Sequence, residues 1–250
     1  MTDDARDTDA TPEAAADATG AAAVEAPEER RQRFRAVRRL MRAEVYYGAA
    51  LAAFALLTAF AYFNAYFGWD LRAARAVQSV EGVYGFMRVV SMVGDGWTPY
   101  ALTGATALAF LLFGRKSEAA GLFFSAAGGG IAARVIKMSV GRPRPVAELV
   151  NVFGEGDDLS FPSGHVTFYV TYFGFLFFAA YALLPRGSLA RRLALVATAL
   201  PVLLVGLSRV YLGRHWPSDT LGAYLMGGLW LALALDLYRR LKKRRGEVKR

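Results

Sequence analysis

The sequence has only two histidines, and each stands in a short polar stretch beside an apolar run. His165 lies in FPSGHVTF, residues 161–168, and His215 lies in SRVYLGRHWPSD, residues 208–219. Imidazole exchanges a proton near neutral pH and can attack an electrophile, so both histidines are candidates for acid–base or nucleophilic chemistry. The chain has no cysteine, which excludes a thiolate nucleophile, a disulfide framework and a thiolate metal site.

Several basic residues fall near the histidines, at the ends of apolar runs. Lys137 and Arg144 belong to the stretch KMSVGRPRP, residues 137–145, and Arg209 precedes His215 by six positions. Few acids are present to pair with these bases, and charged groups beside membrane spans are costly without a partner. The pattern therefore indicates an anionic ligand, and phosphate is the natural candidate because guanidinium groups match its oxygens.

Three stretches, taken in order, resemble the tripartite signature of the type 2 phosphatidic acid phosphatase superfamily. They are Lys137 followed after six residues by Arg144-Pro145, the turn Pro162–His165, and Ser208-Arg209 followed after five residues by His215 and after three more by Asp219. The stretch GDGW, residues 94–97, is similar to the bacterial membrane members, which include phosphatidylglycerophosphatases and undecaprenyl pyrophosphate phosphatases. The resemblance covers roughly residues 43–238, and any one stretch alone would be weak evidence.

The resemblance implies three catalytic residues. His215 would be the nucleophile that attacks phosphorus and forms a phosphohistidine. Asp219 would hold one ring nitrogen of His215 and leave the other free to attack. A simpler role for Asp219, as an acid at a helix start that stabilises the helix dipole, is compatible with this one. His165 would protonate the leaving oxygen and would then activate the water that completes hydrolysis.

The resemblance also implies a phosphate-binding set that stabilises charge in the transition state. Its members are Lys137, Arg144, Ser163, Gly164 and Arg209. Three residues are expected to play a secondary part, and they are Arg142, Pro162 and Ser208. Ser208 is expected to hydrogen-bond at a helix end rather than to act as a nucleophile. No metal ion and no other cofactor is expected, because the sequence shows no carboxylate cluster to hold a metal and the phosphohistidine route needs none.

The elements that must position these residues are predicted to be membrane helices. Hydrophobic residues make up 55% of the chain and charged residues 20%, a balance typical of membrane proteins. Six runs are predicted to span the bilayer core of ~30 Å: residues 45–67, 99–113, 118–137, 166–184, 193–211 and 217–238. Residues 70–97 are too charged to span and are predicted to form one or two helices at the interface. The predicted fold class is therefore an all-α integral membrane protein, with a short interfacial helical segment between its first two spans.

Four parts are predicted along the chain. Residues 1–29 hold nine acidic residues and one basic residue, with almost no large apolar side chains, and are predicted to be a disordered acidic tail. Residues 30–44 are a basic juxtamembrane segment, residues 45–238 a six-span phosphatase domain, and residues 239–250 a basic cytoplasmic tail.

The distribution of Lys and Arg predicts the topology. With six spans both termini share one side of the membrane, and 21 of the 30 basic residues fall on segments of that side. The positive-inside rule then places both termini in the cytoplasm, in a plasma or inner membrane. His165 and His215 would lie at the opposite, extracytoplasmic face, where the outer ends of the last four spans meet.

The predicted function is hydrolysis of phosphate or pyrophosphate monoesters of lipids, such as undecaprenyl pyrophosphate, phosphatidylglycerol phosphate or phosphatidic acid. Two alternatives stay open. A lipid phosphotransferase would pass the same phosphohistidine to a second acceptor. A lipid or anion transporter would use the bases for binding alone, but the two matching halves expected of a transporter are not seen. The predicted partners are the substrate and membrane lipids and not nucleic acid, because most bases flank apolar runs, and the oligomeric state is left open.

Overall fold

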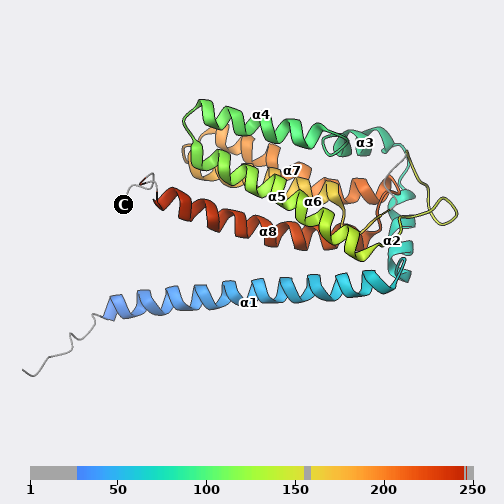
Figure 1. Cartoon of the computed structure of the whole chain (residues 1–250), viewed down its shortest axis with the longest axis horizontal. Coiled ribbons are helices and arrows are strands. Elements are labelled where there is room, and N and C mark those ends of the chain that lie inside the picture. The colour runs from blue at the N-terminus through green and yellow to red at the C-terminus, as the bar shows by residue number, and fades with distance from the viewer. Residues whose placement is uncertain (1–26, 155–158, 245, 247–250) are drawn as a thin grey trace, which may run out of the picture. The chain divides into compact units, whose positions relative to one another are not determined.

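The computed structural model describes residues 27–154, 159–244 and 246, with side chains from residue 44 onward. Every regular element in these ranges is a helix: α1 Pro27–Phe63, α2 Gly68–Gln78, α3 Tyr84–Met92, α4 Thr98–Leu112, α5 Lys116–Val140, α6 Gly164–Leu183, α7 Leu189–Tyr211 and α8 Pro217–Arg244 (Figure 1). Within the described residues, five helical segments are long and apolar enough to cross a membrane. The chain divides into two compact units, Met1–Val45 and Tyr46–Arg250, and the site described below lies wholly in the second.

Helices α5 to α8 form an up-and-down bundle in which α6 contacts each of the other three. Helices α5 and α7 end where α6 and α8 begin, and the short helices α2 and α3 lie at the same end of the bundle (Figure 1). The sequence predicts this meeting of four helix ends. It brings the basic end of α5, the FPSGH turn and the connection between α7 and α8 into one region.

The core of the bundle is centred on α6, which is apolar on all its faces because other helices surround it. Val166, Tyr169 and Phe175 of α6 are completely buried, together with Leu122 of α5 and Val205 of α7. The outward faces of the helices are also apolar, as many large hydrophobic side chains remain exposed on them. Such a surface suits lipid rather than water.

The segment between α5 and α6 turns directly after α5, and its two ends contact each other. Gly141 ends α5 with φ of 66°, a left-handed conformation that glycine adopts without steric cost. The backbone N–H of Ser160 donates to the carbonyl of Arg142 at 2.7 Å, and Pro143 forms an isolated bridge with Leu159. These contacts hold the start of the segment against the residues that lead into α6.

Helices α2 and α3 pack on the end of α7 near the site. Ala74 of α2 is buried in a cluster with Val210 and Trp216, and Met87 of α3 is buried against Tyr211. The charged region between the first two predicted spans therefore folds as two short helices, which is within the predicted number.

The first two predicted spans differ from the helices in the structure. The first ends at Phe63 rather than at residue 67, because the chain leaves the helix at Asn64 and the carbonyls of Asn64 and Ala65 accept hydrogen bonds from Arg142. The second, α4, has 15 residues, which is fewer than the about 20 that a bilayer crossing needs. The structure therefore supports five long apolar helices and one shorter apolar helix, where the sequence predicts six spans.

The predicted tails correspond only in part to described residues. Residues 1–26 of the predicted acidic tail lie outside the described ranges, and residues 27–29 begin α1. At the other end, α8 continues to Arg244, so the boundary predicted at residue 238 falls inside a helix. Arg245 and residues 247–250 lie outside the described ranges.

Candidate active site

His215 lies in the short connection between α7 and α8, with only 1% of its surface exposed. Its Nε2 lies 3.4 Å from a terminal guanidinium nitrogen of Arg144. On the other side of the ring, Nδ1 lies 3.3 Å from Oγ of Ser160 and 3.7 Å from a carboxylate oxygen of Asp219. The two ring nitrogens therefore face opposite charges.

These neighbours determine which ring nitrogen of His215 carries the proton. The hydroxyl of Ser160 donates to Oδ2 of Asp219, so its oxygen can only accept from the ring. The guanidinium of Arg144 can only donate, so it favours a lone pair on Nε2. Nδ1 is accordingly assigned the proton. A neutral imidazole with its lone pair at Nε2 is the form that can act as a nucleophile.

The surroundings of His215 also keep the ring neutral. Burial lowers the pKa of His215 well below its ordinary value of 6.5, and the positive charges of Arg144, Lys137 and Arg209 lower it further. Because the unfolded chain would bind a proton at this position below about pH 6.5, unfolding takes up a proton there in acid. The contribution of this group to stability is therefore lost as the pH falls below that value.

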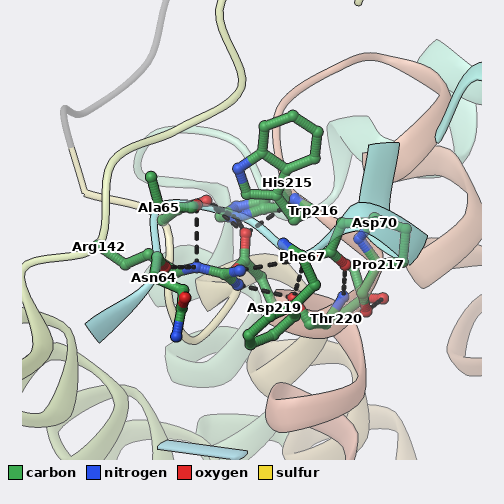
Figure 2. Close-up of polar contacts among 12 residues, drawn as sticks. Asn64, Ala65, Phe67, Asp70, Arg142, His215, Trp216, Pro217, Asp219 and Thr220 are labelled. Carbon is green, nitrogen blue, oxygen red and sulfur yellow. Dashed lines mark hydrogen bonds and ion pairs between the residues drawn. The ribbon is translucent and has the colours of Figure 1, made fainter. Parts of the chain in front are cut away.

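Asp219 is completely buried in the first turn of α8 and is fixed by donors on both carboxylate oxygens. Oδ2 accepts from the backbone N–H of Trp216 at 2.8 Å and from Ser160. Oδ1 accepts from the guanidinium of Arg142 at 2.6 Å (Figure 2). The carboxylate thus has one orientation, with Oδ2 toward His215.

The contacts of Arg142, which is expected to play a secondary part, are with carboxylates and backbone carbonyls. The side chain is buried, and its Nε donates to the carbonyls of Asn64 and Ala65 at 3.1 Å each (Figure 2). One terminal nitrogen donates to Asp219, and the other donates to Asp70 at 3.0 Å. The guanidinium is therefore directed at two carboxylates, and its contacts in the structure are those of a structural cation.

Two of the expected phosphate-binding bases border His215. Lys137, in the last turn of α5, is 7% exposed and donates from Nζ to the carbonyl of Leu159 at 3.0 Å. Arg144 donates to the carbonyl of Arg214 at 2.6 Å while its terminal nitrogen stays close to Nε2 of His215. Arg144 therefore lies beside the assigned lone pair, and Lys137 is close enough for its positive charge to act on the ring.

Ser163 and Arg209, which are also expected to bind phosphate, have buried hydrogen-bond donors. Among the described residues, neither the hydroxyl of Ser163 nor Nε of Arg209 has a hydrogen-bond partner. Ser163 precedes α6 but makes no side-chain capping bond, and Gly164 is the first residue of that helix. Arg209 is held through a terminal nitrogen, which donates to Ser91 at 2.6 Å. Buried donors without partners are costly, and a helix start with added bases is a favourable place for an anion.

His165 is held by the segment between α3 and α4. Its Nε2 lies 2.8 Å from Oδ1 of Asp95. This hydrogen bond lowers the pKa of Asp95, as do the positive charges of Arg209 and Arg214, although partial burial acts in the opposite direction. The carboxylate is thus ionised at neutral pH and can only accept, so Nε2 of His165 carries a proton.

The close approach of Gly94 further restricts the position of His165. A Cβ atom at residue 94 would come within 2.8 Å of Cγ of His165 and closer still to Cδ2. Only glycine leaves room for the ring here. Residues Gly94 and Asp95 of the GDGW stretch therefore form a seat for the imidazole.

Some of the site was not predicted from the sequence. Ser160, Asp70 and the contact between Asp95 and His165 emerge only from the fold, and no local pattern marks the first two. Of the secondary residues, Pro162 lies in the turn before α6, and Ser208 donates to the carbonyl of Met87 at 2.6 Å, as expected for a hydrogen bonder at a helix end. The described residues contain no group of three His, Asp or Glu side chains that could hold a metal ion.

Several known proteins are similar to this chain in sequence. The family model of the PAP2 superfamily matches residues 118–243. The chain is 37% identical over 120 residues to the lipid A 1-phosphatase of Rhizobium johnstonii, covering 45% of this chain and 44% of that protein. It is 38% identical over 109 residues to YbjG of Escherichia coli, whose name assigns it provisionally as an undecaprenyl-diphosphatase, covering 40% of this chain and 50% of that protein. The chain spans about half the length of the curated relatives that it matches.

A solved structure shares the fold. The crystal structure of the first transmembrane PAP2 type phosphatidylglycerolphosphate phosphatase from Bacillus subtilis superposes with a TM-score of 0.69. The superposition covers 78% of this chain and 97% of that one, at 21% sequence identity. At this identity the likeness establishes the architecture alone.

The seat of His165 is testable by substitution. The variant Gly94→Ala is expected to displace the imidazole and to destabilise the protein by about 1–3 kcal/mol, the usual cost of overpacking. Spectra of protein labelled with ¹⁵N only in histidine would show it, since the chain has two histidines. The His165 signals are expected to shift while those of His215 stay. Gly104→Ala is the control, because a Cβ there meets nothing within 4 Å. An unchanged His165 spectrum in Gly94→Ala would show that the described approach is wrong.

Proposed function

Since the chain belongs to the PAP2 superfamily, we propose that it is a membrane lipid phosphatase that works through a phosphohistidine on His215. The observation that carries the proposal is the state of that ring. Its Nδ1 is directed to Ser160 and Asp219, and its Nε2 lies next to Arg144. A buried, neutral imidazole with a lone pair directed at a cationic region fits a nucleophile that attacks a bound phosphoryl group.

In the proposed first step, Nε2 of His215 forms a bond to phosphorus and the bond from phosphorus to the leaving oxygen breaks. His165, doubly protonated at the start of this step, gives its Nδ1 proton to the leaving oxygen and keeps its Nε2 proton directed at Asp95. The ring of His215 keeps its proton on Nδ1 and gains positive charge, which the carboxylate of Asp219 stabilises. In the second step His165 takes a proton from water, the water oxygen bonds to phosphorus, and the bond to Nε2 breaks. Free phosphate and the starting enzyme result.

Binding of the phosphoryl oxygens is proposed to fall to the bases and donors around the ring. Lys137, Arg144 and Arg209 supply positive charge, and Ser163 with the N–H of Gly164 supplies donors at the start of α6. The buried Ser163 hydroxyl and Arg209 Nε, which have no partner among the described residues, support this part of the proposal. Phosphoryl transfer depends mainly on such positioning and charge stabilisation.

The substrate class is proposed to be the phosphate or pyrophosphate monoester of a lipid. The site lies at one end of a bundle whose outer helix faces are apolar, so a headgroup can reach it while the hydrocarbon part stays in the bilayer. The names of the relatives support this class, as they include a lipid A 1-phosphatase and YbjG, named provisionally as an undecaprenyl-diphosphatase. Undecaprenyl pyrophosphate, phosphatidylglycerol phosphate and phosphatidic acid remain the substrates to compare.

The chain is proposed to cross the inner membrane six times, with α4 as the short second span, both termini cytoplasmic and the site extracytoplasmic. The excess of Lys and Arg near the termini supports this orientation. A reporter fused after Arg250 is expected to be active only in its cytoplasmic form. A reporter that reads outside would contradict the orientation, and a reporter fused within the loop at residue 115 should read the same side as the terminus.

The activity is testable with purified protein and a panel of lipid phosphates and pyrophosphates. Wild type is expected to release phosphate in the presence of EDTA, and His215→Ala is expected to lose at least about 10³-fold in rate because the nucleophile is gone. Asp236→Asn is the control, since this carboxylate is exposed and forms an ion pair with Arg240 on the same helix. Wild-type rates in His215→Ala would contradict the nucleophile, and loss of activity in EDTA would contradict the metal-free route.

The same assay separates hydrolysis from transfer. Stoichiometric release of free phosphate, unchanged when an acceptor lipid is added, is the result expected of a phosphatase. Phosphorylation of the acceptor at the expense of free phosphate would instead assign the chain as a phosphotransferase.

A further inference from the structure

We propose that Asp70 of α2 is a positioning residue for His215, acting through Arg142 and Asp219. The proposal rests on the proposed function, because it assigns a role in the chemistry of His215. Asp70 lies outside the matched family region, residues 118–243, and outside the three signature stretches. It nevertheless reaches the site through a continuous set of buried contacts.

Asp70 is completely buried, and its carboxylate contacts the start of α8, Arg142 and the start of its own helix. Oδ1 accepts from the backbone N–H of Ser218 at 2.8 Å, and Oδ2 accepts from the hydroxyl of Ser218 at 2.6 Å. Oδ2 also accepts from the guanidinium of Arg142 at 3.0 Å and from the N–H of Phe67 at 3.1 Å. Ser218 is the residue before Asp219, so these two hydrogen bonds join α2 directly to the turn that carries the Asp219 carboxylate.

Arg142 connects the two carboxylates. One terminal nitrogen donates to both Asp219 and Ser218, at 2.6 and 2.7 Å, while the other donates to Asp70. The guanidinium also lies over the ring of Phe67, with its central carbon 4.8 Å from the ring centroid. A planar guanidinium held on both edges cannot rotate without losing several charge-assisted bonds. Its position therefore fixes Oδ1 of Asp219 and, through it, the direction in which Oδ2 faces His215.

The same contacts set the charge beside His215. Two carboxylates and one guanidinium carry a net negative charge, and all three side chains are buried, where charge interactions are strong. Attack by Nε2 places positive charge on the ring, so a net negative cluster stabilises the transition state. Without the charge of Asp70 the cluster would be neutral overall. The positive charge of Arg142 would then act on Asp219 alone and would reduce the negative charge that Asp219 presents to His215.

The test combines histidine NMR with kinetics on full-length protein in detergent or nanodiscs. Wild type labelled with ¹⁵N-histidine is expected at pH 7 to show His215 with its proton on Nδ1, and the variant His165→Gln assigns the signals. Asp70→Asn is expected to populate the tautomer with the proton on Nε2. It is also expected to lower kcat by about 10- to 100-fold, the range for groups that orient a functional histidine, with KM unchanged, because Asp70 does not touch the substrate.

A second variant keeps the proposal testable even if the Asp70→Asn protein does not fold. Arg142→Lys keeps the positive charge but cannot contact both carboxylates and the two carbonyls together, so the same tautomer change and kcat loss are expected. Asp236→Asn, at an exposed carboxylate, should match wild type in both measurements. If the folded Asp70→Asn or Arg142→Lys protein kept the wild-type tautomer and kcat, the proposal would be overturned.

The two readouts also separate this proposal from the proposed function. If wild type hydrolysed no lipid phosphate, the function would fail, while the tautomer measurement would still decide whether Asp70 controls His215. If wild type were active and Asp70→Asn kept the wild-type tautomer and kcat, the positioning role would fail and the phosphatase would stand.

Discussion

The buried guanidinium of Arg142, held between Asp70 and Asp219, is the interaction on which the rest of the site depends. A buried cation needs carboxylate partners, and removing either partner leaves an uncompensated charge. Because the three residues come from α2, the segment after α5 and the start of α8, satisfying this charge brings those three parts together. The orientation of Asp219, and with it the tautomer of His215, follows from that arrangement.

The membrane bundle provides the second constraint. Four long helices place their ends in one region, and the polar turns between them collect there because charged groups are excluded from the apolar faces. The bases proposed to bind phosphate, the FPSGH turn and the connection carrying His215 are therefore neighbours although they are far apart in sequence. This arrangement concentrates positive charge around a neutral imidazole, and the positive charge in turn helps to keep that imidazole neutral.

Much of this could be predicted from the sequence, and the exceptions have physical causes. The apolar runs predict α5, α6 and α7 to within four residues at each end, and they predict the start of α8 but not its continuation to Arg244. The spacing of the signature stretches predicts which side chains lie near His215. The partners of Arg142 could not be predicted. They are Asp70, 72 positions away, and Asp219, 77 positions away, and no pattern in the sequence around Arg142 indicates them. Ser160 and the seat formed by Gly94 were missed for the same reason: each depends on a contact between distant segments. The chemical roles of His215, His165 and Asp219 stay predictions.

The central claim is that His215 becomes covalently phosphorylated. It is tested most directly by mixing wild-type protein with a lipid phosphate labelled with ³²P on the phosphoryl group, quenching in alkali within the first turnover and mapping the labelled peptide. The account predicts label on His215, stable in alkali and lost in acid as a phosphohistidine is. Label on Ser163, or full turnover with no labelled protein at any time, would contradict it.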